Sequence, residues 1–164
     1  MNAEHIEAIR HTMAAYNIAG DRMRIDALAA TFTDDGVLET PNARWEGRDA
    51  IAAGLGRRAP EDQAPQEQPS ARRPSFVRHN LTTSLIELTG PDAAEGRSYF
   101  QVLTDIGADH AGCYVDRFRR TDEGWRIAHR RVLIDWMSPD SLFEALRAAH
   151  LARLAGKATQ PVRP

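Results

Sequence analysis

Residues 76–136, FVRHNLTTSLIELTGPDAAEGRSYFQVLTDIGADHAGCYVDRFRRTDEGWRIAHRRVLIDW, hold most of the β-structure that this chain predicts. Four segments are rich in Val, Ile, Leu, Tyr, Phe and Thr, which favour strands. They span 76–88, 97–106, 111–120 and 125–136. Short turn-forming sequences separate them at 89–92, 107–109 and 121–124. Because such short connections join antiparallel neighbours, we predict a four-stranded meander.

The flanking sequence predicts helices. Apolar residues recur at spacings of three and four over 4–20, which is the period of an amphipathic helix. Shorter helices are expected at 25–32 and 50–57, and a turn at 34–36 leads into a short strand at 37–40. After the meander, Ser138-Pro139-Asp140 predicts the start of a last helix, because Ser favours the N-cap and Pro the first turn.

Helices that are separated in the sequence from an antiparallel sheet indicate the α+β class. Strands of this length must twist and curl, so a cavity is expected between the sheet and the helices. We predict a single domain over 1–156. Within it, the Pro- and Gln-rich segment 59–74 is expected to be a mobile loop and a candidate lid. A polar tail follows at 157–164.

The composition is that of an ordinary water-soluble globule, since 42% of the residues are apolar, 27% are charged and the net charge is -2. A nucleic-acid or acidic-membrane partner would need a basic face, which argues against both. No apolar run approaches the roughly 20 residues that cross a bilayer, and residues 1–5 lack signal-peptide features. Cys113 is the single cysteine, so no intrachain disulfide forms and a cytoplasmic location is expected.

No cofactor or metal is expected. The six histidines are scattered, without the short ligand spacing of a zinc site. Gly54-Leu55-Gly56 is too short for a phosphate-binding loop, and it ends a predicted helix instead of opening one.

His79 and Asp21 are the candidates for chemistry by side chains alone. By period-two counting, His79 shares a strand face with Val77, Leu81 and Leu85, and this apolar face is expected to point inward. Its side chain is either a core group satisfied by one hydrogen bond or a general base, the role that imidazoles commonly take in enzymes. Asp21 either caps the following helix or orients His79 and stabilises its imidazolium. Spacing alone does not bring the two together.

The whole layout resembles the SnoaL-like branch of the nuclear transport factor 2-like superfamily, over roughly residues 4–145. The resemblance is carried by YNIAGDRMRIDAL at 16–28, FTDDGV at 32–37, WEGRDAI at 45–51, RHNL at 78–81, GCYVDRF at 112–118 and GWRI at 124–127. It implies a cone-shaped, cystatin-like α+β fold, with the curved antiparallel sheet wrapped around the N-terminal helices. In this order the stretches are specific for the fold and much less so for a reaction.

Within that superfamily the chain is similar to scytalone dehydratase, bile-acid dehydratase and γ-hexachlorocyclohexane dehydrochlorinase. The resemblance implies that Asp21 and His79 are a catalytic pair and that Arg130 helps to hold a leaving group. Two tyrosines of the dehydratases are missing, because Gly20 precedes Asp21 and Thr40 stands where the second is expected. Scytalone itself is therefore not the expected substrate.

Other aromatic and imidazole groups are ambiguous from sequence. Tyr114 or Tyr99 could supply the missing phenol, although each also fits a core aromatic whose hydroxyl is satisfied. His110 falls at a predicted loop, where a solvated residue is the expected interpretation, and Tyr16 is interpreted as packing.

The leading hypothesis is a cofactor-independent lyase, such as a dehydratase, or an isomerase. His79 would remove a proton, Asp21 would orient it, and Arg130 or Tyr114 would stabilise negative charge on a small polyketide-, steroid- or aromatic-like substrate. The alternatives are a polyketide cyclase of the same fold and a non-catalytic binder or structural subunit, like the small subunit of ring-hydroxylating dioxygenases. Because apolar residues fall on both faces of 97–106 and 125–136, a homodimer or homotrimer through the sheet is also expected.

Overall fold

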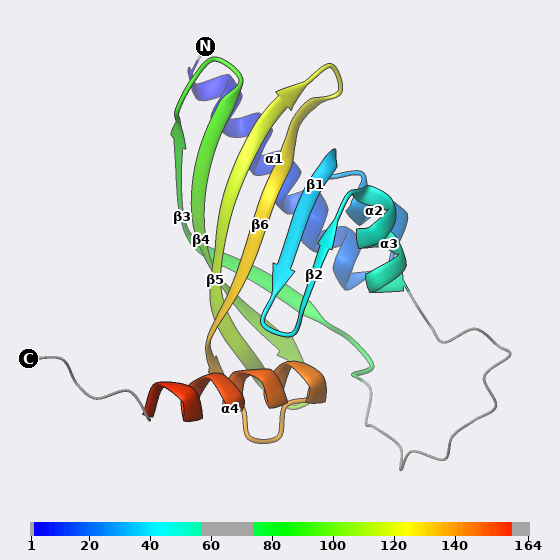
Figure 1. Ribbon diagram of the computed structural model, residues 1–164, viewed down its shortest axis with the longest axis vertical. Coiled ribbons are helices and arrows are strands. Elements are labelled where there is room, and N and C mark those ends of the chain that lie inside the picture. The colour runs from blue at the N-terminus through cyan, green and yellow to red at the C-terminus, as the bar shows by residue number, and fades with distance from the viewer. Residues whose placement is uncertain (1, 57–73, 159–164) are drawn as a thin grey trace, which may run out of the picture.

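The computed structural model describes residues 2–56 and 74–158 and confirms the α+β fold (Figure 1). A single curved sheet has the strand order β2-β1-β6-β5-β4-β3. The helices are α1 (Asn2–Asp21), α2 (Ile25–Ala29), α3 (Arg48–Gly56) and α4 (Glu144–Ala158). The strands are β1 (Phe32–Thr40), β2 (Ala43–Glu46), β3 (Arg78–Leu88), β4 (Ala93–Thr104), β5 (Gly107–Thr121) and β6 (Gly124–Met137).

The long helix α1 lies across one face of the sheet, and in Figure 1 the sheet passes in front of it. Ile9 and Met13 of α1 are buried in a core cluster that includes Ile127 of β6. The hydroxyl of Thr12 donates a 2.8 Å hydrogen bond to the carbonyl oxygen of Trp125. These contacts fix α1 along the sheet, and its C-terminal end lies against β3.

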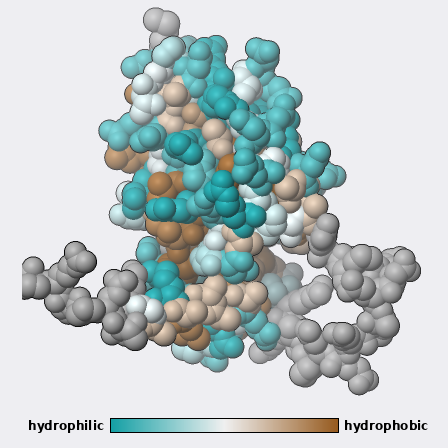
Figure 2. Space-filling model, viewed as in Figure 1, coloured by the Kyte–Doolittle hydropathy of each residue, from teal (hydrophilic) through white to brown (hydrophobic). Residues whose placement is uncertain are grey.

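The opposite face of the sheet is open. Leu85, Tyr99 and Trp136 are 60%, 49% and 48% exposed, although large apolar side chains are usually covered. Figure 2 shows apolar residues gathered on the viewed face above α4, among hydrophilic neighbours.

The four strands expected from 76–136 are confirmed as β3 to β6, and they form an antiparallel meander. Two further strands extend it: β1 pairs in parallel with β6, and β2 pairs antiparallel with β1. The prediction missed β2 because it has only four residues. It missed the parallel ladder because that ladder joins distant parts of the chain, such as Val37 and His129.

The turn predicted at 34–36 is wrong, because these residues lie inside β1. The register with β6 shifts between Phe32 and Val37, so the strand is irregular here. A Cβ on Gly36 would lie 2.8 Å from Cβ of Phe32 and 2.9 Å from the carbonyl oxygen of Thr33. Glycine is therefore needed at position 36 because the strand backbone and Phe32 leave no room for a side chain, and not because the chain turns there.

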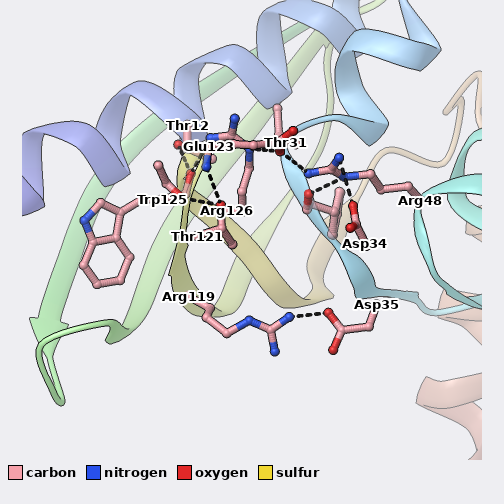
Figure 3. Close-up of polar contacts among 12 residues, drawn as sticks. Thr12, Thr31, Asp34, Asp35, Arg48, Arg119, Thr121, Glu123, Trp125 and Arg126 are labelled. Atoms are coloured by element: carbon pink, nitrogen blue, oxygen red, sulfur yellow. Dashed lines mark hydrogen bonds and ion pairs between the residues drawn. The ribbon is translucent and has the colours of Figure 1, made fainter.

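Ion pairs surround this irregular part of β1 (Figure 3). Nη1 of Arg48 lies 3.0 Å from Oδ1 of Asp34, and its Nη2 lies 2.7 Å from Oε2 of Glu123 in the β5–β6 turn. Arg119 of β5 pairs with Asp35. Each exposed pair adds little stability, but together they mark where α3, β1 and the β5–β6 hairpin meet.

One strand face differs from the prediction. The register of β3 with β4 shifts between Leu81 and Ser84, which reverses the alternation of faces beyond that point. Leu85, expected on the inward face with His79, is exposed.

The last helix also begins later than predicted, at Glu144 and not after Ser138. The carboxylate of Asp109 accepts a 2.7 Å hydrogen bond from the Ser141 hydroxyl and a 3.0 Å bond from the Leu142 N–H. These bonds hold the intervening segment in an irregular conformation, so α4 starts only beyond it. Figure 1 shows α4 across the lower end of the sheet.

The loop predicted at 59–74 lies outside the described residues except for Pro74, as do residues 159–164 of the predicted tail. Residues 157 and 158 of that tail belong to α4. Within the two described ranges, every helix is too short or too polar to cross a membrane.

Candidate functional site

A cavity of about 490 Å³ lies between the sheet, the N-terminal helices and the start of α4. The four described helices and all six described strands contribute to its lining, so residues from every part of the fold form it. Most of the lining is apolar, including Ile25, Trp45, Leu55, Phe100, Ile134 and Phe143. A few polar side chains in an apolar pocket of this size are typical of a small-molecule site.

Asp21 and His79 meet at this cavity, and both line it. Oδ1 of Asp21 lies 2.6 Å from Nδ1 of the His79 ring. The same carboxylate accepts the backbone N–H of His79, at 3.1 Å to Oδ2 and 3.3 Å to Oδ1. The Asp21 side chain is 9% exposed and the His79 ring 23% exposed. The C-terminal end of α1 and the start of β3 thus place a carboxylate against an imidazole.

This geometry determines what the imidazole can do. Because a carboxylate beside Nδ1 favours a proton on that nitrogen, Nε2 of His79 is left as the acceptor. A neutral imidazole with a free Nε2 can take a proton, and the adjacent Asp21 carboxylate can stabilise the resulting imidazolium.

A second His–Asp pair borders the same cavity through its histidine, while its aspartate is not among the lining residues. His110, expected in a solvated loop, is instead buried in β5 and lines the cavity. Its Nδ1 is 2.8 Å from Oδ1 of Asp109, which also accepts the Ser141 hydroxyl. The rings of His79 and His110 are 6.5 Å apart, centre to centre, and nearly perpendicular.

The strand register explains why His110 faces His79. His79 of β3 pairs with Val102 of β4, and Val102 pairs with His110 of β5. Directly opposite residues share a sheet face. This alignment could not be predicted from the sequence, because it depends on how β3, β4 and β5 pair.

Burial sets the ionisation of the second pair. Burial lowers the pKa of His110 below 6.5, although Asp109 acts in the opposite sense. Burial acts to raise the pKa of Asp109, but hydrogen bonds from His110, Leu142 and Ser141 outweigh it and the pKa is lowered. At neutral pH the pair is therefore a neutral imidazole beside a carboxylate.

Tyr114 and Tyr16 both line the cavity, and Tyr16 packs against both core clusters, as expected. Burial raises the pKa of Tyr16 above 10 and that of Tyr114 well above it. Both phenols are therefore protonated donors at neutral pH. Gly20 and Thr40, which stand where tyrosines were missing, also line the cavity.

Arg130 lies behind these tyrosines and is not part of the lining. It is fully buried and donates two hydrogen bonds to Asp116, from Nε at 2.8 Å and from Nη2 at 2.7 Å. Its guanidinium carbon is 4.2 Å from the ring centre of Tyr16 and 4.1 Å from that of Tyr114. Burial opposes its charge, but Asp116 outweighs burial and raises the pKa of Arg130. The guanidinium is thus a fixed positive charge between two cavity-lining rings.

Within residues 2–56 and 74–158, no three His, Cys, Asp or Glu side chains lie close enough together to hold a metal ion. The remaining predicted phenol, Tyr99, is half-exposed on the outer side of the sheet and does not line the cavity.

The chain belongs to the SnoaL-like domain family, whose model matches residues 1–131. No curated protein sequence matches it. A protein of unknown function from Mycobacterium tuberculosis has a TM-score of 0.69 and 26% identity, covering 92% of this chain and 91% of its own. A candidate scytalone dehydratase from Novosphingobium aromaticivorans has a TM-score of 0.67 at 20% identity, covering 84% and 88% of the two chains. LinA has a TM-score of 0.67 at 17% identity, covering 84% and 90%.

These neighbours establish the fold: solved structures with the same architecture are described as cystatin-like and NTF2-like. The family and fold expected from the sequence are therefore confirmed. The fold is of the type found in a candidate scytalone dehydratase and in LinA.

Proposed function

We propose that this protein is a cofactor-independent lyase or isomerase that moves a proton on a small apolar substrate. The observation that supports it is the 2.6 Å contact between Asp21 and Nδ1 of His79 at the wall of an apolar cavity. An acid–base pair needs such a contact, and a purely structural core histidine does not need to face a cavity.

In the proposed reaction, Nε2 of His79 takes a proton from a carbon next to a carbonyl group. The C–H electron pair forms a carbon–carbon double bond, and the negative charge moves to the carbonyl oxygen. Asp21 stabilises the imidazolium. In an isomerase the proton returns to another carbon, and in a dehydratase it passes to a leaving hydroxyl, which departs as water. General base catalysis of this kind contributes about 10²–10⁴-fold.

The developing oxyanion needs a donor, and Tyr114 is the proposed one. Its raised pKa keeps the phenol protonated, and it lines the cavity. Arg130, 4.1 Å from the Tyr114 ring centre, would act through the two tyrosines as a positioning residue. We further propose that the neutral His110 accepts a hydrogen bond from a substrate hydroxyl and orients it.

A purely structural role, as in a subunit that acts by assembly, is the less favoured alternative. A pocket filled by side chains would support that role, whereas this chain has a cavity of about 490 Å³ that is lined by the Asp21–His79 pair and by His110. Assembly through the outer face of the sheet is compatible with catalysis inside.

The test is exchange of α-protons for deuterium in a panel of activated cyclic ketones, measured by NMR. The wild type should accelerate exchange on at least one ketone, and His79→Gln should lose at least about 10²-fold of that acceleration. His11→Gln is the matched control, because His11 is an exposed histidine of α1 outside the cavity. Equal exchange in all three proteins would rule out the acid–base proposal.

A further inference from the structure

Asn17 is a buried polar side chain that the proposed proton transfer does not use. It lies on α1, one helical turn before Asp21, so both project from the same side of the helix. The residue is 6% exposed and lines the cavity. Its Oδ1 is fully buried and has no hydrogen-bond partner among the described residues.

An unpartnered amide is costly in a protein interior. Buried polar groups are nearly always hydrogen-bonded, and an orphaned one destabilises the fold. The neighbouring buried polar group of α1 follows that rule, because the Thr12 hydroxyl is bonded to the carbonyl oxygens of Trp125 and Ala8. The Asn17 amide oxygen therefore lacks the hydrogen bond that the buried Thr12 hydroxyl on the same helix has.

The amide can serve a ligand in either orientation. An Asn side chain carries one carbonyl oxygen and one NH₂ group, and a half-turn exchanges them. The group that meets a ligand is therefore a donor to a carbonyl oxygen or an acceptor for a hydroxyl. An apolar side chain of similar size would fill the same wall without this option.

We propose that Asn17 is a specificity-determining residue that hydrogen-bonds an oxygen of the bound ligand. The helical spacing places it about 6 Å along α1 from Asp21, as one turn of four residues at 1.5 Å each requires. Because most of the lining is apolar, the ligand class is then a mostly apolar ring compound bearing a ketone or phenol oxygen. In the proposed reaction, that oxygen belongs to the same ring system as the carbon that His79 deprotonates.

The statement that His79 deprotonates a ligand carbon rests on the proposed function, but the proposed contact between Asn17 and a ligand oxygen does not. Binding can be measured without turnover, so the two proposals fail separately. If 2-tetralone shows no catalysed exchange but the oxygen preference below is found, the proton-transfer proposal fails and the Asn17 contact stands.

The experiment compares two probes that differ in one oxygen, 2-tetralone and tetralin, by calorimetric titration. The wild type should bind 2-tetralone about fivefold to tenfold more tightly, the ratio that one net hydrogen bond gives. Asn17→Leu, made in a Tyr114→Phe background so that the proposed phenol donor is absent, should bind both probes equally. Asn80→Leu in the same background is the matched control, because Asn80 is exposed on β3 and outside the cavity, and it should still prefer 2-tetralone.

Thermal unfolding of the ligand-free proteins supplies an independent readout. Because Asn17→Leu removes an unsatisfied buried amide, its melting temperature should rise above that of the wild type. Asn17→Ala, which introduces no bulk, is the second variant if Asn17→Leu does not fold, and in the same Tyr114→Phe background it should also lose the oxygen preference. The proposal is overturned if the wild type shows no preference, if either variant keeps it, or if Asn17→Leu melts lower than Asn17→Ala.

Discussion

Asp21 holds His79 at two points, the ring Nδ1 at 2.6 Å and the backbone N–H at 3.1 Å. The backbone bond fixes the start of β3 relative to the end of α1, and the ring bond fixes the orientation of the imidazole. A single carboxylate thus sets both where the histidine stands and which nitrogen is free.

Replacing Asp21 by Asn should therefore impair turnover more than binding. An amide cannot stabilise an imidazolium by charge, and it can hold the ring in the wrong tautomer. We expect kcat on an exchanging ketone to fall by about 10²–10⁴-fold with little change in KM. Asp34→Asn is the control, since Asp34 is 91% exposed and should behave as wild type. A raised KM with an unchanged kcat would contradict the assigned role.

The buried His110 should make stability depend on pH in a defined window. Its pKa is lowered by burial, so the unfolded chain takes up a proton near pH 6.5 while the folded protein does not. The free energy of unfolding should then fall as pH drops below about 6.5, until the lower folded pKa is reached. Stability is fully retained above that window. The lowered pKa of Asp109 acts at more acidic pH, since its contribution is lost as pH falls through the usual carboxyl range.

Urea unfolding between about pH 5 and pH 8 measures the His110 effect. The difference between wild type and His110→Gln should change with pH below 6.5 and level off above it. His11→Gln again serves as the control. Parallel curves for wild type and His110→Gln across the range would show that His110 does not carry the effect.

Removing either partner of the buried pair of Arg130 and Asp116 should strongly lower the free energy of unfolding. Both side chains are buried, and removing one partner leaves an uncompensated charge in the core. Arg130→Met or Asp116→Leu should each cost about 3–5 kcal/mol of unfolding free energy. The double variant should be more stable than the sum of the two losses predicts, as measured by urea denaturation. Strict additivity would contradict a direct pair.

The open sheet face predicts self-association as a homodimer or homotrimer. Tyr99 and Trp136 are half-exposed, Leu85 is 60% exposed, and apolar residues gather on this side in Figure 2. Light scattering at micromolar concentration should give a multiple of the 18.2 kDa chain mass, and Tyr99→Glu with Trp136→Glu should lower it. A wild-type mass equal to one chain would contradict this prediction.

Local patterns in the sequence predicted the elements, and their failures have physical causes. The period of α1 and the long strand segments reflect burial on one face, so they were confirmed. Leu85 was assigned to the wrong face because a register shift near Ser84 reverses the alternation. The last helix was placed early because the bonds of Asp109 to Ser141 and Leu142 come from a distant strand.

Part of the candidate site was likewise predicted from the sequence, and part of it was not. Asp21 and His79 were singled out from their residue types and positions, the family resemblance added support for them as a pair, and the structure brings them together. His110 was missed because its position depends on the registers of two ladders through Val102. Arg130 was expected at a leaving group, whereas it lies behind the tyrosines that face the cavity.

The most direct test of the central claim is the tautomer of His79, read from the ¹⁵N resonances of its ring at mildly alkaline pH. We predict a proton on Nδ1 and a free Nε2 in the wild type, and a loss of that preference in Asp21→Asn. A wild-type ring protonated on Nε2, or an unchanged ring in Asp21→Asn, would contradict the account.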